Sequence, residues 1–259
     1  MADHIQIINS RQMLKRVRGG RDGLYPFLEN NTWDTVRHFD DFLGDEIQGS
    51  GATPGMYEVI TGVDGDVHIL ADQPNGVAEL QASVGVGASA EYCGLSLPGL
   101  AFTGNRNAVI AARINLDAVT TVKCEVGFTD VTTDAGAVNV LATPTANAAD
   151  AAVWVMDTND DANWQGVGIQ AGTIATKLEP ATGPTAATFE TLIVALLDTT
   201  VYFARLNANG ALVYGPTAVV NGITAATALV PWIFVQLRGA VDRNVRIDFI
   251  DVRARRTVS

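Results

Sequence analysis

From about residue 107 onward, the apolar residues of this sequence recur at every second position. In the stretch NAVIAARINLDA (107–118), one set of alternate positions is apolar throughout: Ile110, Ala112, Ile114 and Leu116. Successive side chains of a β-strand point to opposite faces, so this alternation predicts a strand with one buried face. The stretch TVKCEVGFTD (121–130) repeats the pattern. It places Cys124 among apolar neighbours, where we expect a structural rather than a reactive thiol.

Turn residues divide the remainder of this region into further strands. TFETLIVALLDTTVYFARLNANGALVYG (188–215) contains three strands joined by DTT and NANG, and Asn209-Gly210 is a hairpin signal because both residues tolerate positive φ. WIFVQLRG (232–239) and NVRIDFIDVRARR (244–256) supply two more, whereas TPTANAADA (143–151) and EPATGPTAAT (179–188) are predicted to be long loops. Helical periodicity, which the crossovers of a parallel sheet would need, is absent. The pattern therefore predicts an all-β fold, an antiparallel two-sheet β-sandwich.

The beginning of the chain has a different pattern. Its apolar residues have roughly helical spacing, and a Gly-Gly pair then stops the pattern: Ile5, Ile8, Leu14 and Val17. A helix this short is marginal alone because nucleation is costly, so it needs a partner surface. We therefore divide the chain into a basic helix with an extended arm (1–37), used for anchoring and oligomerisation, and a sandwich domain (38–259). We expect a homo-oligomer, with a trimer as one option.

Composition excludes a membrane-spanning protein from the expectation. Hydrophobic residues make up 47% and charged residues 17% of the 259 residues, as in globular proteins. No apolar run approaches the ~18 residues of a membrane-spanning helix. The first residues lack the apolar stretch and cleavage site of a signal peptide, so we expect synthesis in a cytoplasm.

The formal net charge of −11 is distributed unevenly along the chain. Residues 1–23 hold five basic and two acidic residues, residues 238–259 hold six and three, and the residues between them therefore carry −17. Such an acidic body repels nucleic acid and anionic membranes. The basic ends are either simply solvated or dock on an acidic protein surface. The candidate docking residues are Arg11, Lys15, Arg16, Arg18, Arg21, Arg253, Arg255 and Arg256.

The stretch VWVMDTNDDANWQGVG (153–168) is the most acidic turn between two predicted strands. Asp157, Asn159 and Asp161 match positions 1, 3 and 5 of a calcium loop, but Ala162 and Gly168 replace the glycine at position 6 and the glutamate at position 12. Asp and Asn also cap hairpin turns through bonds to nearby backbone amides, so a hairpin is the favoured interpretation. A glycan or calcium loop remains the alternative.

The tryptophans allow two interpretations. An exposed Trp164 beside the acidic turn could stack on a sugar in the alternative just given, whereas in the favoured interpretation Trp164 covers a sheet edge. Trp154 and Trp232 are predicted to lie in the core.

Residues for catalysis are missing from the sequence. Retaining glycanases need two carboxylates ~5 Å apart on one sheet face, and no E-x-D-x-E run provides them. Glu125 with Asp130, and Asp248 with Asp251, have odd spacings that point to opposite faces of a regular strand. The three histidines form no H-E-x-x-H, and there is no G-x-S-x-G or phosphate loop. We expect no enzymatic activity, no cofactor and no metal.

Three stretches together resemble a known family. They are HFDDFLGDEI (38–47), the acidic tryptophan hairpin, and the final strand VRIDFIDVRARR (245–256). The chain resembles the concanavalin-A-like lectin/glucanase jelly roll, in particular the versions in tailed-bacteriophage virion proteins. The resemblance implies two curved antiparallel sheets with the chain ends close together. The E-x-D-x-E run of the glucanase members is absent here, and the calcium and sugar ligands of the legume lectins have no counterparts that can be assigned residue by residue.

The resemblance and the charge distribution lead to one expected function and two alternatives. We expect a phage virion structural protein, of the capsid decoration or head surface type, which contacts the major capsid protein or another virion protein through its basic ends. The first alternative is a carbohydrate-binding or host-recognition module of a phage tail or fibre. The second is a glycan hydrolase or lyase with an unusual carboxylate pair.

Overall fold

The computed structural model describes residues 35–43, 47, 57–70, 73, 76–83, 85, 90–97 and 101–256. The predicted helix within residues 1–20, and with it Arg11, Lys15, Arg16, Arg18 and Arg21, lies outside these residues. In the part of the chain that is described, no helix has the length and hydropathy needed to cross a membrane.

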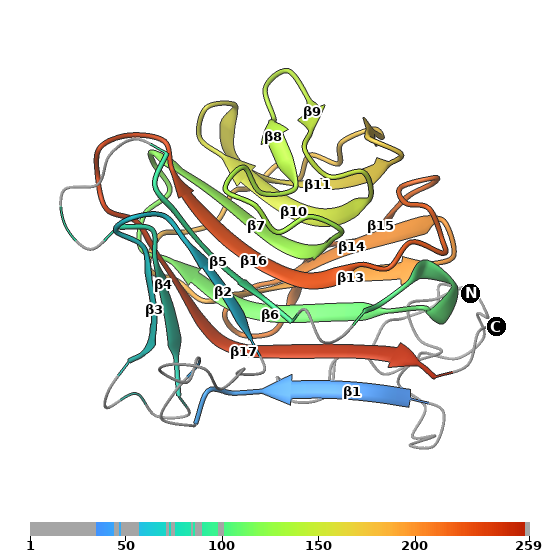
Figure 1. Ribbon diagram of the computed structural model, residues 1–259, viewed down its shortest axis with the longest axis horizontal. Helices are drawn as coiled ribbons and strands as arrows, with labels where there is room; N and C mark the ends of the chain where they lie inside the picture. Colours follow the sequence, from blue (N-terminus) through green and yellow to red (C-terminus); the bar gives the residue numbers. More distant parts are fainter. Residues whose placement is uncertain are drawn as a thin grey trace.

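Two antiparallel sheets form a sandwich (Figure 1). Sheet I has eight strands in the order β15-β14-β13-β6-β17-β4-β3, and β1 also pairs with β17. Its strands are β1 (Thr35–Asp40), β3 (Asp66–Ile69), β4 (Ala78–Gln81), β6 (Val109–Leu116), β13 (Glu190–Leu197), β14 (Thr200–Leu206), β15 (Leu212–Val219) and β17 (Asn244–Arg255).

Sheet II has seven strands in the order β12-β11-β10-β7-β16-β5-β2. Its strands are β2 (Glu58–Thr61), β5 (Tyr92–Ser96), β7 (Val122–Thr129), β10 (Ala151–Asp157), β11 (Asp161–Gln170), β12 (Thr173–Ile174) and β16 (Val230–Leu237). A separate pair, β8 (Val138–Val140) and β9 (Thr145–Ala146), and a short 3-10 helix, η1 (Gly104–Arg106), complete the elements. The predicted antiparallel two-sheet fold is confirmed.

The main core lies between the sheets, and the predicted alternation places the correct residues in it. Ile110, Ala112, Ile114 and Leu116 of β6 all belong to this core, as do Val122, Cys124, Val126 and Phe128 of β7. The Cys124 side chain is fully buried, as its alternation with apolar neighbours predicts.

The NANG turn between β14 and β15 is a hairpin, with a different geometry from the one that two positive-φ residues would give. Only Gly210 has a positive φ, of 76°, and its N–H donates to the Asn207 carbonyl at 2.9 Å. The Asn207 side chain accepts bonds from the N–H groups of Asn209 and Ala211. The side chain of the first residue therefore holds the turn, which is why glycine is required at one position only.

The first and last described strands lie side by side. β1 pairs with the end of β17, so that Thr35 is opposite Arg255. The sandwich thus begins at Thr35, three residues before the predicted domain boundary at residue 38. The pairing also brings the two ends of the described chain to one place.

Candidate functional site

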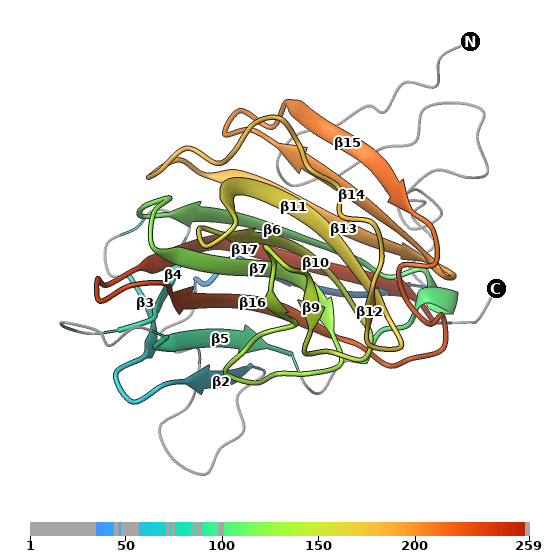
Figure 2. The same ribbon diagram turned by 90° about the horizontal axis from the view of Figure 1, so that it is seen from above.

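The outer face of sheet II, the face away from sheet I, carries a second apolar cluster. It includes Val153 and Val155 of β10 and the stacked rings of Trp232 and Phe234 on β16, whose centroids are 5.3 Å apart. Residues 131–149, which we call the cover hairpin, carry β8 and β9 and lie on this side of the sheet (Figures 1 and 2). Val138 and Leu141 of the cover hairpin are fully buried in the same cluster. The chain therefore fills the centre of this face with its own residues.

Glu125 of β7 lies beneath the cover hairpin and is fully buried. Its carboxylate accepts bonds from the N–H groups of Ala137 at 2.7 Å and Val138 at 3.0 Å, and from Trp232 Nε1 at 3.0 Å. Lys123 Nζ lies 2.8 Å from Glu125 Oε1. Four donors thus satisfy the carboxylate, and two of them belong to the cover hairpin.

Lys123 holds the same segment from the other side of the ion pair. Its Nζ donates to the Ala135 carbonyl at 2.6 Å and to the Val138 carbonyl. A Cβ atom at Gly136, which has a φ of 67°, would lie 2.7 Å from the Glu125 oxygens. The ion pair therefore fixes the backbone of residues 135–138 and requires glycine at 136.

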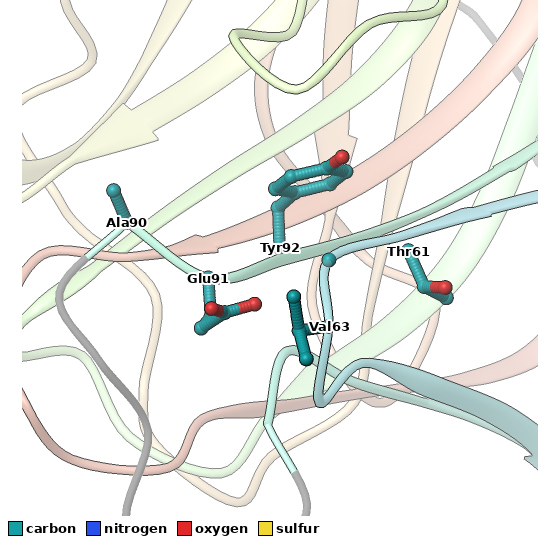
Figure 3. Close-up of a pocket in the computed structure, with 6 residues that line it drawn as sticks. Thr61, Val63, Ala90, Glu91 and Tyr92 are labelled. Carbon is teal, nitrogen blue, oxygen red and sulfur yellow. The ribbon is translucent and has the colours of Figure 1, made fainter.

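At one end of sheet II, a shallow pocket of about 410 Å³ remains open between the β2–β3 turn and the start of β5 (Figure 3). It is lined by Thr61, Gly62, Val63, Ala90, Glu91 and Tyr92. Glu91 Oε2 is buried and has no hydrogen-bond partner, and a Cβ atom at Gly62 would lie 2.1 Å from it. The half-buried Tyr92 packs against Phe234. This pocket has no motif that the sequence could have revealed.

Comparison with known proteins bears on the fold. No protein-family model and no curated protein sequence matches the chain. Solved structures do match. Arcelin-5, a lectin-like defense protein from Phaseolus vulgaris, has a TM-score of 0.56 and 10% identity over 85% of this chain and 98% of its own. Peanut lectin has a TM-score of 0.54 and 10% identity over 85% and 97%.

A beta-1,3-glucanase from Mycobacterium marinum also matches, with a TM-score of 0.53 and 13% identity over 83% of this chain and 97% of its own. The sandwich is a concanavalin-A-like jelly roll. Lectins and glucanases both have this fold, so at such identities the likeness shows the architecture alone.

The acidic turn of this jelly roll is a hairpin. β10 ends at Asp157 and β11 begins at its cross-strand partner, Asp161. Arg238 donates to both oxygens of Asp157 at 2.8 and 2.6 Å, and Asp157 also accepts from the N–H of Asn159 at the exposed tip. Asp161 accepts from the N–H of Asn163 at 2.8 Å. An arginine and the turn backbone therefore already use these carboxylates, which does not favour the calcium alternative.

Trp164 is fully buried, so the interpretation of this residue as an exposed stacking platform is corrected. Its ring lies in the core between the sheets, and its Nε1 donates to Glu190 Oε1 at 2.7 Å. Burial raises the pKa of Glu190, an effect that the bond from Trp164 and the charge of Arg205 partly offset. Trp154 and Trp232 are fully buried as predicted.

The odd-spaced pair Asp248 and Asp251 does not point to opposite faces as a regular strand would require. The β17–β6 register shifts between Ile247 and Phe249, and this irregularity changes the alternation. Asp248 bonds Arg113 at 2.7 Å, and Asp251 bonds Arg37 at 2.8 Å. Both carboxylates therefore contact arginines on the outer face of sheet I.

The basic C-terminal residues divide into paired and unpaired ones. Arg253 bonds both oxygens of Asp251, at 3.0 and 2.5 Å. Burial raises the pKa of Asp251, but the bonds and charges of Arg253 and Arg37 outweigh burial and hold it below its ordinary value. Arg255 and Arg256 make no ion pair with the described residues, and Arg256 Nε lies 3.4 Å from the Thr35 carbonyl. Two of the three candidate docking arginines at this end thus keep their charge available.

Proposed function

We propose that this chain is a non-enzymatic structural protein of a phage virion, which acts at the particle surface through contacts rather than through chemistry. The observation that supports the absence of chemistry most strongly is the state of Glu125. The acid at the centre of the sheet II outer face is covered by the cover hairpin and accepts four bonds. It has no remaining capacity to exchange a proton with a substrate.

The other buried carboxylates support the same conclusion. With the exception of Asp150, each buried acidic side chain of the described residues has a basic partner. A hydrolase of this fold class would need two free carboxylates facing one substrate. The described residues provide no such pair.

Attachment through the chain ends is supported by charge and topology. Both ends of the sequence are basic, whereas the middle is acidic. Thr35 and Arg255 are cross-strand partners, so the terminal segments leave the body from one place, next to the unpaired Arg255 and Arg256. Such a basic patch suits an acidic capsid surface, and we propose the major capsid protein or another virion protein as the partner.

A binding experiment with charge variants tests this proposal. Full-length protein is mixed with virions that lack it, and the bound fraction is measured by sedimentation at low and moderate salt. Glutamine at the five basic residues of 1–23, together with Arg255 and Arg256, is expected to lower binding at least tenfold. A control with glutamine at Arg106 and Arg243 on the body should bind normally. Equal binding by both variants would contradict the proposal.

Carbohydrate binding is a second candidate, and the Thr61–Tyr92 pocket is the observation that favours it. An aromatic ring beside a carboxylate oxygen without a partner suits a sugar, which offers apolar ring faces and hydroxyl donors. A glycan array tests it with the Tyr92→Ala variant and Tyr202→Ala on the other sheet as the matched control. Hits that Tyr92→Ala alone removes would favour this candidate over the structural one.

A further inference from the structure

The outer face of sheet I is apolar where a solvated sheet would be polar. Its side chains form rows across the strands, and the cross-strand pairs of the central row are Asp251–Ala111, Ala111–Ile193 and Ile193–Ala204. The rows on either side run through Arg253, Val109, Ala195 and Tyr202, and through Phe249, Arg113, Thr191 and Leu206. Three alanines thus lie between larger side chains and leave a shallow depression.

The apolar side chains of this face are shielded from solvent. Ala111 and Ile193 are 0% exposed, Leu206 is 4% exposed and Phe249 is 6% exposed. Figure 1 shows no labelled strand on the outer side of sheet I, and no described element packs there. Neighbouring side chains alone do not bury an isoleucine at the centre of an outward sheet face. The cover must come from residues outside the described ranges.

The position of β1 points to one segment. Thr35 is opposite Arg255, and the row of Arg253, Val109, Ala195 and Tyr202 starts beside it. Four strand spacings of ~4.8 Å separate β1 from β14, a span of about 19 Å that roughly six extended residues can cross. The sequence LYPFL (24–28) lies seven to eleven residues before Thr35.

We propose that the outer face of sheet I is the docking surface for residues 24–34 of the same chain. Leu24, Tyr25, Phe27 and Leu28 supply the apolar side chains that the depression between its rows fits. The arginines of this face are held by Asp248 and Asp251, so the interaction is apolar rather than electrostatic. The basic residues 11–21 would then start from the β14 side of the body. This inference does not depend on the virion role.

Photo-crosslinking in the full-length chain tests the contact directly. A benzophenone amino acid replaces Tyr202, which is half-buried at the margin of the face, and in a control protein it replaces Tyr92 on sheet II. After irradiation and digestion, we expect crosslinks from position 202 to residues 24–34 and none to this segment from position 92. An equal mixture of ¹⁴N- and ¹⁵N-labelled protein should give products within one copy. Crosslinks to another segment or to a second copy would overturn the proposal.

A second measurement uses the apolar segment itself. Serine at Leu24, Phe27 and Leu28 is expected to expose the face and to increase the fluorescence of a bound hydrophobic dye several-fold. The control places serine at three exposed apolar residues, Leu43, Val63 and Val220, whose exposures are 67%, 92% and 68%. Unchanged dye fluorescence in the first variant would overturn the proposal.

Discussion

Lys123 and Glu125 form an ion pair that is fully buried beneath the cover hairpin. Removing two charges from water is costly, and only good geometry and further hydrogen bonds offset that cost. Here the pair has both, because Glu125 accepts three further N–H bonds and Lys123 donates to two carbonyls. Each residue therefore depends strongly on its partner.

We expect Lys123→Met to lower the free energy of unfolding by about 3–5 kcal/mol, because it leaves the Glu125 charge buried without a partner. The double variant Lys123→Met/Glu125→Gln should recover at least half of this loss. Urea unfolding measures both changes. Lys177→Met, which breaks a partly exposed pair with Asp160, is the control and should cost at most ~1 kcal/mol. A double variant as unstable as the single one would show that the ion pair is not the cause.

His38 belongs to a hydrogen-bonded group at the β1 end of the core. Tyr57 O–H donates to Asp40 at 2.8 Å, so its oxygen is left to accept from His38 Nε2–H at 3.2 Å. Burial lowers the pKa of His38 below its ordinary value of 6.5, although the charges of Asp40 and Asp251 oppose the shift. The folded state therefore disfavours protonation of this ring more than the unfolded state does.

The sign of the pH dependence follows from this shift. The contribution of neutral His38 to stability is fully present above pH 6.5 and declines as the pH falls below 6.5 towards the lowered folded pKa. We expect the wild-type protein to lose more unfolding free energy than His38→Gln between pH 7.5 and 5.5. Chemical denaturation at both pH values measures the difference. An equal loss in the two proteins would exclude His38 as the cause.

At the scale of elements, the long strands could be predicted and the cover hairpin could not. β6, β7, β13, β14, β16 and β17 follow clear alternation or turn signals in the sequence. The region 131–149 is rich in alanine, threonine and aspartate and resembles a solvated loop. Its few apolar residues are buried only because Lys123 and Glu125 of another strand bind its backbone, and no local pattern contains that information.

Leu141 tests the packing of this hairpin. It is fully buried against the apolar cluster on the outer face of sheet II. We expect Leu141→Ala to lower the unfolding free energy by about 2–5 kcal/mol, as for a core leucine. The control Leu212→Ala, at a side chain that is 40% exposed on the edge strand β15, should cost about 0.5 kcal/mol or less. Similar small costs at both positions would mean that the hairpin is only loosely placed.

At the scale of the whole molecule, the sequence predicts the sandwich but not the location of its open surface. The predicted loop at Asp157 is committed to Arg238, and Trp164 lies in the core, because charges and rings far apart in the sequence meet only after the sheets pair. The β17 irregularity likewise changes which carboxylates share a face. The Thr61–Tyr92 pocket arises from a turn and a strand start that are thirty residues apart.

The two sheets should open together, and the cysteines report on this. Cys93 on β5 and Cys124 on β7 are free and fully buried, and burial raises the pKa of both thiols. We expect a thiol reagent at pH 8 to modify the native protein no faster than it unfolds, and to modify two thiols per chain in denaturant. Fast reaction of one thiol would reveal that part of sheet II opens separately.

The closure of the sheet II outer face is best measured by native-state hydrogen exchange at the amides of Ala137 and Val138. Both donate to Glu125, so their exchange requires the cover hairpin to leave the sheet. We predict that they exchange only through global unfolding, with the same opening free energy as amides in the centres of β7 and β16. An opening free energy that is lower by about 3 kcal/mol or more would contradict a permanently closed face and restore it as a candidate binding groove.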